Sequence, residues 1–247
     1  MRCWASPAWN YRGPGWPEAL SADVYTREDD SRAPAVLLIH GGSWKADGPR
    51  WTMTPIARKL ARNGFAVVNV SYRGTPDYTY PAPLDDLREA LRWMKVNSGE
   101  LGIDPDRIAT FGFSAGAHLA TLLALEDGKC HRVQVIVAGG GPFDLSLYPD
   151  DPSVSAFLGG SYRALPERYH QASPVRQVDS RSPPLFLFHG CQDEVVPPEH
   201  ARRMVQAYRD KGRLVEVRWL NHRGHATSLI FPGSTIDDAV KFLKREL

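Results

Sequence analysis

One sequence feature constrains the fold of this 247-residue chain more than any other. It is a serine between two glycines, at the point where an apolar run of strand length is followed by a run of helical length. The run from Ile108 to Phe113 is typical of a buried strand, and the Ala- and Leu-rich residues from Ala115 onward predict a helix. Between them, Gly112-Phe113-Ser114-Ala115-Gly116 matches the G-x-S-x-G pattern of a strained strand-to-helix turn that exposes a serine hydroxyl. The setting therefore favours Ser114 as a nucleophile over a serine that only caps a helix.

Composition narrows the class of protein. An apolar fraction of 43% and a charged fraction of 23% are ordinary for a globular chain, and the length fits a single α/β domain over residues 1–247. A net charge of +2 is too small to favour nucleic acid as a partner. Cys3, Cys130 and Cys191 have no spacing typical of a disulfide framework or a metal site. Because no stretch resembles a signal peptide or a membrane span, a cytoplasmic protein without a membrane partner is expected.

Apolar runs of strand length alternate with amphipathic helical patterns from Ala35 to the C-terminus. This alternation predicts an α/β fold with a mostly parallel central sheet, helices on both faces and chemistry at the carboxyl ends of the strands. Residues 139–182 break the alternation, which predicts a short cap-like insertion over that edge. Residues 1–19 are expected to form an irregular arm packed on the body. Strands are expected at 20–25 (an edge strand), 35–39, 65–70, 108–113, 133–137, 185–188 and 215–220, and helices at 55–63, 83–96, from 115, 198–211 and 234–247.

A glycine-rich loop follows one of the expected buried strands. His40-Gly41-Gly42-Ser43-Trp44 comes directly after the apolar run Ala35–Ile39. Glycines just beyond a strand allow backbone N–H groups to turn outward together, which is what an oxyanion site requires. A plain glycine turn is the alternative, but an HGG-type loop upstream of a G-x-S-x-G turn favours the oxyanion interpretation.

A serine hydroxyl becomes a good nucleophile when a base removes its proton, and the base needs an acid that fixes its tautomer. Asp193 follows the apolar run Leu185–Phe188 and a glycine turn, and precedes a Val-Val-Pro return. It is the predicted orienting acid, because Glu194 beside it would point away. A helix-capping role is the other interpretation of Asp193.

Among eight histidines, His225 is the predicted base. It follows the last expected strand, and Gly224 frees the backbone so that His225 can reach back over the sheet; His222 is the second choice. A zinc site at these two histidines lacks a third ligand nearby, so no metal is predicted. The chain order Ser114, Asp193, His225 is that of α/β-hydrolases. The remaining histidines are expected at the surface (His131, His170, His200), packed in a helix (His118) or bonded to loop backbone (His40, His189).

Several motifs together carry a resemblance to a known family. They are HGGSW, Ser71-Tyr72-Arg73, Tyr80-Pro81-Ala82, LGIDPDRIATFGFSAGAHLA, HGCQDEVVP and the Gly-His pair near the end. Over roughly residues 20–245 the chain resembles the hormone-sensitive-lipase-like α/β-hydrolases, and among them the small esterases that include acetyl-xylan and feruloyl esterases. The resemblance implies an α/β-hydrolase fold that needs no cofactor.

The resemblance also implies a role for each site residue. It makes Ser114 the nucleophile, Asp193 and His225 its relay, and the backbone N–H groups of Gly42, Ser43 and Ala115 the oxyanion hole. Two positions depart from the family pattern. Ser43 stands where the third glycine of the usual HGGG is found, and Phe113 stands where larger relatives often carry Asp.

The expected function is that of a serine carboxylesterase, which hydrolyses short-chain acyl esters of small molecules through an acyl-enzyme. Because residues 139–182 are too polar and too short to cover a long acyl chain, a shallow acyl pocket is expected, with Trp44 and Tyr72 as aromatic walls. The motifs HGGSW and GFSAGAHLA are also similar to those of arylformamidases, which hydrolyse N-formylkynurenine. A non-catalytic hydrolase-fold binding protein is disfavoured, because no member of the triad is missing.

Overall fold

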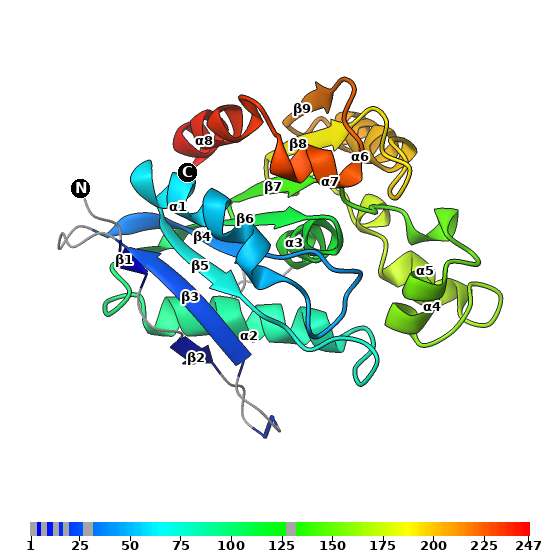
Figure 1. Ribbon diagram of the computed structural model, residues 1–247, viewed down its shortest axis with the longest axis horizontal. Helices are drawn as coiled ribbons and strands as arrows, with labels where there is room; N and C mark the ends of the chain where they lie inside the picture. The colour runs from blue at the N-terminus through cyan, green and yellow to red at the C-terminus, as the bar shows by residue number, and fades with distance from the viewer. Residues whose placement is uncertain (1–3, 6–8, 12–14, 17–19, 27–31, 127–131) are drawn as a thin grey trace.

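The structure is a computed structural model that describes residues 4–5, 9–11, 15–16, 20–26, 32–126 and 132–247 (Figure 1). Over these residues the sheet runs β1-β3-β5-β4-β6-β7-β8-β9, and β2 also pairs with β3. The strands are β1 (Trp4–Ala5), β2 (Trp9–Tyr11), β3 (Leu20–Thr26), β4 (Ala33–Ile39), β5 (Ala66–Val70), β6 (Ile103–Phe113), β7 (Val135–Gly139), β8 (Leu185–Gly190) and β9 (Val215–Leu220). The helices are η1 (Arg50–Met53), α1 (Thr54–Arg62), α2 (Ala82–Val96), α3 (Ala115–Leu125), η2 (Leu145–Leu147), α4 (Pro152–Leu158), α5 (Pro166–Gln171), η3 (Pro174–Arg176), α6 (Glu199–Asp210), α7 (His225–Ile230) and α8 (Thr235–Glu246).

The sheet is mostly parallel, as the alternating pattern predicts. Strands β5, β4, β6, β7, β8 and β9 pair in parallel in that order, whereas β3 is antiparallel to β5. The carboxyl ends of the parallel strands therefore meet at one edge. The loops after β4, β6, β8 and β9 carry the predicted site residues, so the topology collects them at this edge.

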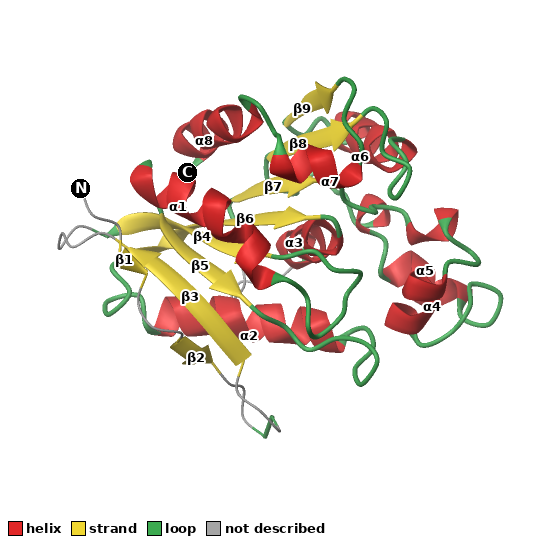
Figure 2. Ribbon diagram, viewed as in Figure 1, coloured by secondary structure: helices red, strands yellow, loops and turns green. Residues whose placement is uncertain are grey.

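Helices cover both faces of the sheet, with α1 and α8 on one face and α2, α3 and α6 on the other (Figure 2). Strand β4 shows why its sequence is a continuous apolar run. Val36 and Leu38 pack in the cluster that includes α1 and α8, whereas Leu37 and Ile39 pack in the cluster of α2, α3 and α6. A strand buried on both faces has no polar side, so the run Ala35–Ile39 was recognisable without alternation.

The N-terminal arm differs from the expectation where the structure describes it. Strands β1 and β2 pair antiparallel with β3, so this part of the arm is regular and β3 is not an edge strand. Trp9 and Tyr11 pack on Trp93 of α2, with ring centroids 5.9 and 6.3 Å apart. Aromatic packing thus holds β2 to the body. Trp16 of the arm lies against Arg73, whose Cζ is 4.6 Å from the centre of the indole ring, and residues 1–3, 6–8, 12–14 and 17–19 lie outside the described residues.

Residues 139–182 form short helices and turns beside the sheet edge, at the right of Figure 1. Their large apolar side chains turn inward: Phe143, Leu145, Phe157 and Leu158 are all fully buried. The segment therefore presents these four side chains to the core and not to a substrate. In the parts of the chain that the structure describes, no helix combines the length and the apolar character needed to span a membrane.

Candidate active site

Ser114 occupies a strained turn between β6 and α3. Its φ of 56° and ψ of −126° lie outside the regions that residues with a side chain prefer. Its backbone N–H donates to the carbonyl of Gly139 at 2.8 Å, which ties the turn to β7. The flanking glycines are required by packing, because a Cβ at Gly112 would lie 2.2 Å from the Gly116 carbonyl oxygen and one at Gly116 would lie 2.2 Å from the Ile39 oxygen.

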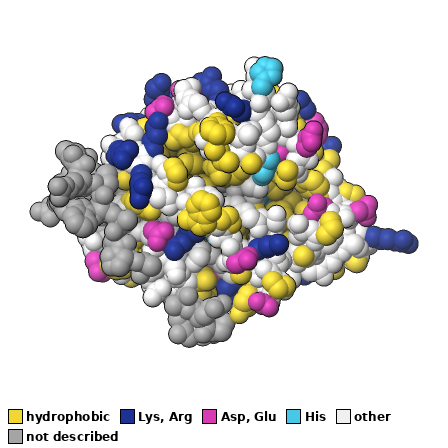
Figure 3. Space-filling view, in the orientation of Figure 1, with side chains coloured by type: hydrophobic (Ala, Val, Ile, Leu, Met, Phe, Trp, Pro, Cys, Tyr) yellow, Lys and Arg dark blue, Asp and Glu magenta, His cyan; other side chains and the backbone are white. Residues whose placement is uncertain are grey.

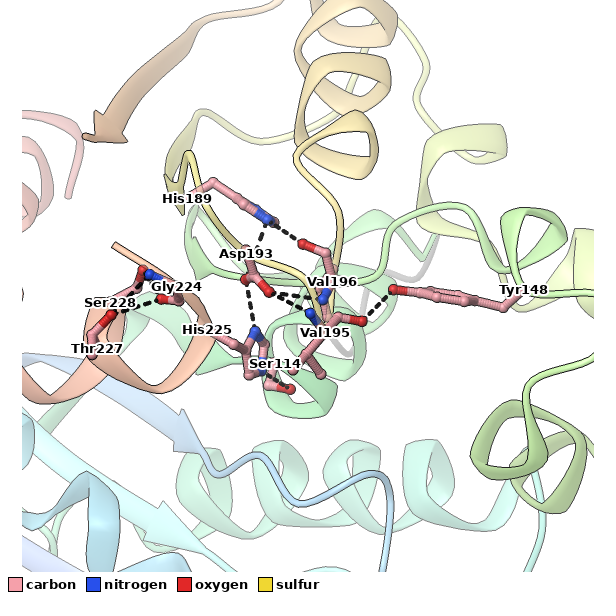
Figure 4. A network of polar contacts seen from close by, with 10 residues as sticks. All are labelled: Ser114, Tyr148, His189, Asp193, Val195, Val196, Gly224, His225, Thr227 and Ser228. Atoms are coloured by element: carbon pink, nitrogen blue, oxygen red, sulfur yellow. Dashed lines mark hydrogen bonds and ion pairs between the residues drawn. The ribbon is translucent and has the colours of Figure 1, made fainter. Parts of the chain in front are cut away.

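Three predicted residues meet at this turn (Figure 4). Ser114 Oγ lies 2.9 Å from His225 Nε2, and His225 Nδ1 lies 2.7 Å from Asp193 Oδ2. Since the carboxylate only accepts hydrogen bonds, it selects the tautomer in which Nδ1 carries the proton. Nε2 is then free to accept a hydrogen bond from the Ser114 hydroxyl. The arrangement has the geometry of a nucleophile, a base and an orienting acid.

Asp193 is buried and held by several donors. Its Oδ1 accepts hydrogen bonds from the backbone N–H groups of Val195 at 3.1 Å and Val196 at 2.8 Å, which leaves Oδ2 for His225. His189 Nε2 donates to the Val196 carbonyl at 2.8 Å and lies 3.5 Å from Oδ2 (Figure 4). Burial lowers the pKa of His189, so this ring is neutral at neutral pH. Glu194 is exposed, in keeping with its predicted direction.

His225 begins α7, a helix that the sequence patterns did not predict. The Gly224 N–H donates to Thr227 Oγ1 at 2.9 Å, and the Gly224 carbonyl accepts from Ser228 Oγ at 2.7 Å, so polar side chains fix the start of this helix. This helix follows β9 and precedes α8 in the chain, and its first residue reaches Ser114, which directly follows β6. His222, the second choice, is exposed and has a φ of 61°, and it takes no part in the hydrogen-bonded path from Ser114 to Asp193.

The loop after β4 lies against the nucleophile. A Cβ at Gly41 would lie 3.0 Å from Ser114 Cβ and from the Phe113 carbonyl oxygen, so a larger residue would crowd the nucleophile turn. The next three residues, Gly42, Ser43 and Trp44, have φ values of 115°, 53° and 59°. A left-handed backbone is unusual at Ser43 and Trp44, which carry side chains, and such strain is found at functional sites. Ser43 adopts this conformation where the family pattern has its third glycine.

A cavity of about 670 Å³ opens beside Ser114 and His225. It is lined by the loop after β4, by η1 and α1, and by α7 and the start of α8, whereas no residue of the 139–182 segment lines it. Trp44 and Tyr72, the expected walls, do not line it either. Trp44 is 4% exposed and stacks on Phe157 at 4.5 Å, and Tyr72 is 1% exposed and stacks on His40 at 4.4 Å. For this cavity the predicted walls are wrong, because both rings point into the core.

The other histidines are mostly structural. His118 is fully buried and accepts a hydrogen bond from Trp44 Nε1 at 3.1 Å, and His40 and His189 bond to loop carbonyls, as expected. The expectation for His200 is wrong, because it is 1% exposed and stacks on Tyr148. His131 lies outside the described residues. Within the described ranges, no group of three His, Cys, Asp or Glu side chains is placed to hold a metal ion.

Three buried histidines predict a loss of stability in mild acid. Burial lowers the pKa of His40, His118 and His200 to about 4, below the ordinary value of about 6.5 for an unfolded chain. Between these values the unfolded state binds more protons, so the free energy of unfolding falls as pH falls from about 6.5 toward 4. We expect about 1 kcal/mol to be lost per histidine between pH 7.5 and 5.5. Urea unfolding at pH 7.5 and at pH 5.5 measures this loss in the free energy of unfolding.

A histidine variant checks the cause of that loss. His118→Gln should unfold with a smaller pH dependence between pH 5.5 and 7.5, because one proton fewer is taken up on unfolding. His222→Gln, an exposed control, should keep the pH dependence of the parent protein. Equal urea midpoints at the two pH values in the parent protein would contradict the assignment.

Comparison with known proteins gives the family. A family model described as BD-FAE matches residues 22–208. The chain belongs to the BD-FAE family. Esterase LipQ of Mycobacterium tuberculosis is similar, with 33% identity over 219 residues that cover 81% of this chain and 52% of LipQ. The chain spans about half the length of the first curated relatives that it matches.

Solved structures share the fold of this BD-FAE family member. A truncated carbohydrate esterase from gut microbiota has a TM-score of 0.86 at 24% identity, and covers 98% of this chain and 96% of its own. An acetyl ester-xyloside bifunctional hydrolase from Caldicellulosiruptor lactoaceticus has a TM-score of 0.82 at 25% identity, and the match covers 95% of this chain and 90% of the hydrolase. The predicted α/β-hydrolase fold is confirmed. The names of these relatives are those of esterases and hydrolases, and they do not support the arylformamidase alternative.

Proposed function

We propose that this chain is a serine carboxylesterase that cleaves short-chain acyl esters of small molecules. The observation that carries the proposal is the continuous hydrogen-bonded path from Ser114 through His225 to Asp193 at a strained turn. The esterase names of relatives such as LipQ support the same reaction class. The cytoplasmic location expected from the N-terminal sequence stays a prediction, as does a single domain with no partner other than a small-molecule ester.

The proposed reaction has two halves. Ser114 Oγ attacks the ester carbonyl carbon while its proton passes to His225 Nε2, and Asp193 stabilises the imidazolium that forms. The carbonyl oxygen gains negative charge and binds the backbone N–H groups of Gly42, Ser43 and Ala115. Nε2–H then protonates the departing alcohol oxygen, which leaves the acyl group on Ser114. Water attacks the acyl-enzyme with His225 again as base, and the carboxylic acid is released.

The buried apolar residues of the 139–182 segment predict a preference for short acyl groups. A long acyl chain needs an extended apolar trough, but the large apolar side chains of this segment already pack in the core. We expect kcat/KM for 4-nitrophenyl acetate and butyrate to exceed that for octanoate by at least roughly tenfold, because a chain too long for a shallow acyl pocket displaces the ester carbonyl from Ser114 Oγ, and a displacement of about 1 Å can cost about 100-fold in rate. A side-by-side assay of the three esters measures the preference.

The same assay separates the esterase from the arylformamidase. N-formylkynurenine, included at the same enzyme concentration, should be hydrolysed far more slowly than the acetate ester. A preference for octanoate would contradict the short-acyl prediction. A formamide rate well above the acetate rate would contradict the carboxylesterase assignment.

A further inference from the structure

The walls of the cavity beside Ser114 are mostly apolar, although the cavity is open to water. Large apolar side chains line it from α1, α7 and α8, among them Ile56, Leu229 and Ile236. Trp51 and Ile230 line it as well, and they are 75% and 64% exposed. Figure 3 shows hydrophobic side chains gathered on this face of the molecule, over η1 and along α7 and α8. Exposed apolar side chains grouped at one cleft mark a binding surface.

The polar side chains of the cavity are few. Apart from Ser114 and His225, those among its described lining residues are Ser43, Thr52 and Lys59. Lys59 is already paired, because its Nζ lies 2.7 Å from Asp237 Oδ1. A sugar ring needs hydrogen-bond partners for its hydroxyl groups when they leave water. The walls therefore match an apolar group better than a sugar.

The location of His225 indicates that the cavity faces the alcohol half of the ester. In the first half-reaction Nε2–H must reach the departing alcohol oxygen, so the group on that oxygen begins next to His225. His225 is the first residue of α7, and Leu229 and Ile230, one turn further on, line the cavity. A group that extends from the alcohol oxygen into this cavity meets walls that include α7 and Trp51.

We propose that this cavity is the alcohol subsite and that it binds an apolar alcohol of aryl or branched-alkyl class, with Trp51 and Ile230 as specificity-determining residues. The proposal rests on the proposed esterase function. In the step that the subsite serves, the bond from Ser114 Oγ to the acyl carbon forms, and the bond from that carbon to the alcohol oxygen breaks. The serine proton passes through Nε2 to the alcohol oxygen, so the neutral alcohol leaves and no co-reactant is needed.

A series of acetate esters tests the proposal, because all of them form the same acetyl-enzyme and differ only in the alcohol. Methyl acetate, benzyl acetate and a mono-acetylated methyl xyloside are compared by kcat/KM. Benzyl acetate should exceed methyl acetate by about 50-fold, the effect expected when about 100 Å² of additional apolar surface leaves water. It should also exceed the acetylated xyloside.

Two variants and a control locate the effect. Trp51→Ala and Ile230→Ala should each reduce the ratio of kcat/KM for benzyl acetate to kcat/KM for methyl acetate by roughly tenfold. Both side chains are mostly exposed, so their removal does not open the core. Val96→Ala, which removes a side chain 68% exposed at the end of α2 and away from the cavity, should change neither rate.

Other outcomes overturn the proposal. The first is a preference for the acetylated xyloside over benzyl acetate. The second is a change in the acyl-length profile of benzyl esters, from acetyl to hexanoyl, when Trp51 is replaced by Ala, because the cavity would then hold the acyl chain. Failure of the proposed function would differ from both, since no ester in the series would then leave an acyl group on Ser114 in a mass spectrum of the quenched enzyme.

Discussion

Replacing Ser114 by Ala is expected to lower kcat/KM for 4-nitrophenyl acetate by about 10⁵- to 10⁶-fold. The variant keeps the cavity, His225 and the loop after β4, but it has no atom that can form the acyl-enzyme. What remains is the modest acceleration that binding and oxyanion contacts give to attack by water. The steady-state rate of 4-nitrophenol release at low substrate concentration measures kcat/KM. In a stopped-flow experiment the parent enzyme should also show a burst equal to its active-site concentration when deacylation is the slower half, and the variant should show none.

A phosphonate that labels active serines provides the second readout for this variant. It should add one covalent group to the parent enzyme and none to Ser114→Ala. Ser161→Ala, which changes an exposed serine of the 139–182 segment, should keep the burst and the label. Equal labelling of the Ser114 variant and the parent enzyme would show that another residue is the nucleophile.

Replacing Asp193 by Asn is expected to lower kcat by about 10⁴-fold. The amide can still accept the hydrogen bonds of Val195 and Val196 through its oxygen, so its NH₂ group would face His225 Nδ1 where Oδ2 now lies. An NH₂ group donates, so it selects the tautomer in which the proton is on Nε2. That nitrogen then cannot accept the proton of Ser114.

The neighbouring carboxylate gives a matched control for this experiment. Glu194→Gln changes charge and hydrogen-bonding in the same way one residue along the chain, but the side chain is exposed, and we expect kcat within about twofold of the parent enzyme. Thermal unfolding of both variants checks that the fold is retained. A kcat for Asp193→Asn within tenfold of the parent value would remove Asp193 from the relay.

The sequence was most informative where a segment is buried by its own composition. Strand β4 and helix α2 were predicted within two residues at each end, because a doubly buried strand and an amphipathic helix each have a distinct pattern. The order of Ser114, Asp193 and His225 was also readable, because each follows an apolar strand pattern and parallel strands end at a common edge. For these residues local pattern and tertiary position agree.

Prediction was wrong where a distant part of the chain decides the outcome. Trp44 was expected as an aromatic wall of a shallow acyl pocket, but the ring is buried and stacks on Phe157, which lies 113 residues further along the chain. Helix α7 was missed because its six residues contain no helical repeat, and hydrogen bonds to Gly224 hold its start. His200 was missed for a different reason. Its spacing of four from the buried Met204 would have placed it on the inner face of α6.

The glycines on either side of Ser114 are needed for the fold and not for the chemistry. Gly112 and Gly116 have no room for a Cβ because β6, α3 and the end of β4 approach one another there, and none of these contacts involves the serine hydroxyl. A descendant that lost catalysis but kept the fold would still need both glycines, because a methyl group at either position would disrupt the sheet. A G-x-S-x-G pattern therefore identifies the turn in active and inactive descendants alike, and the pairing of His225 with Asp193 is what distinguishes the active ones.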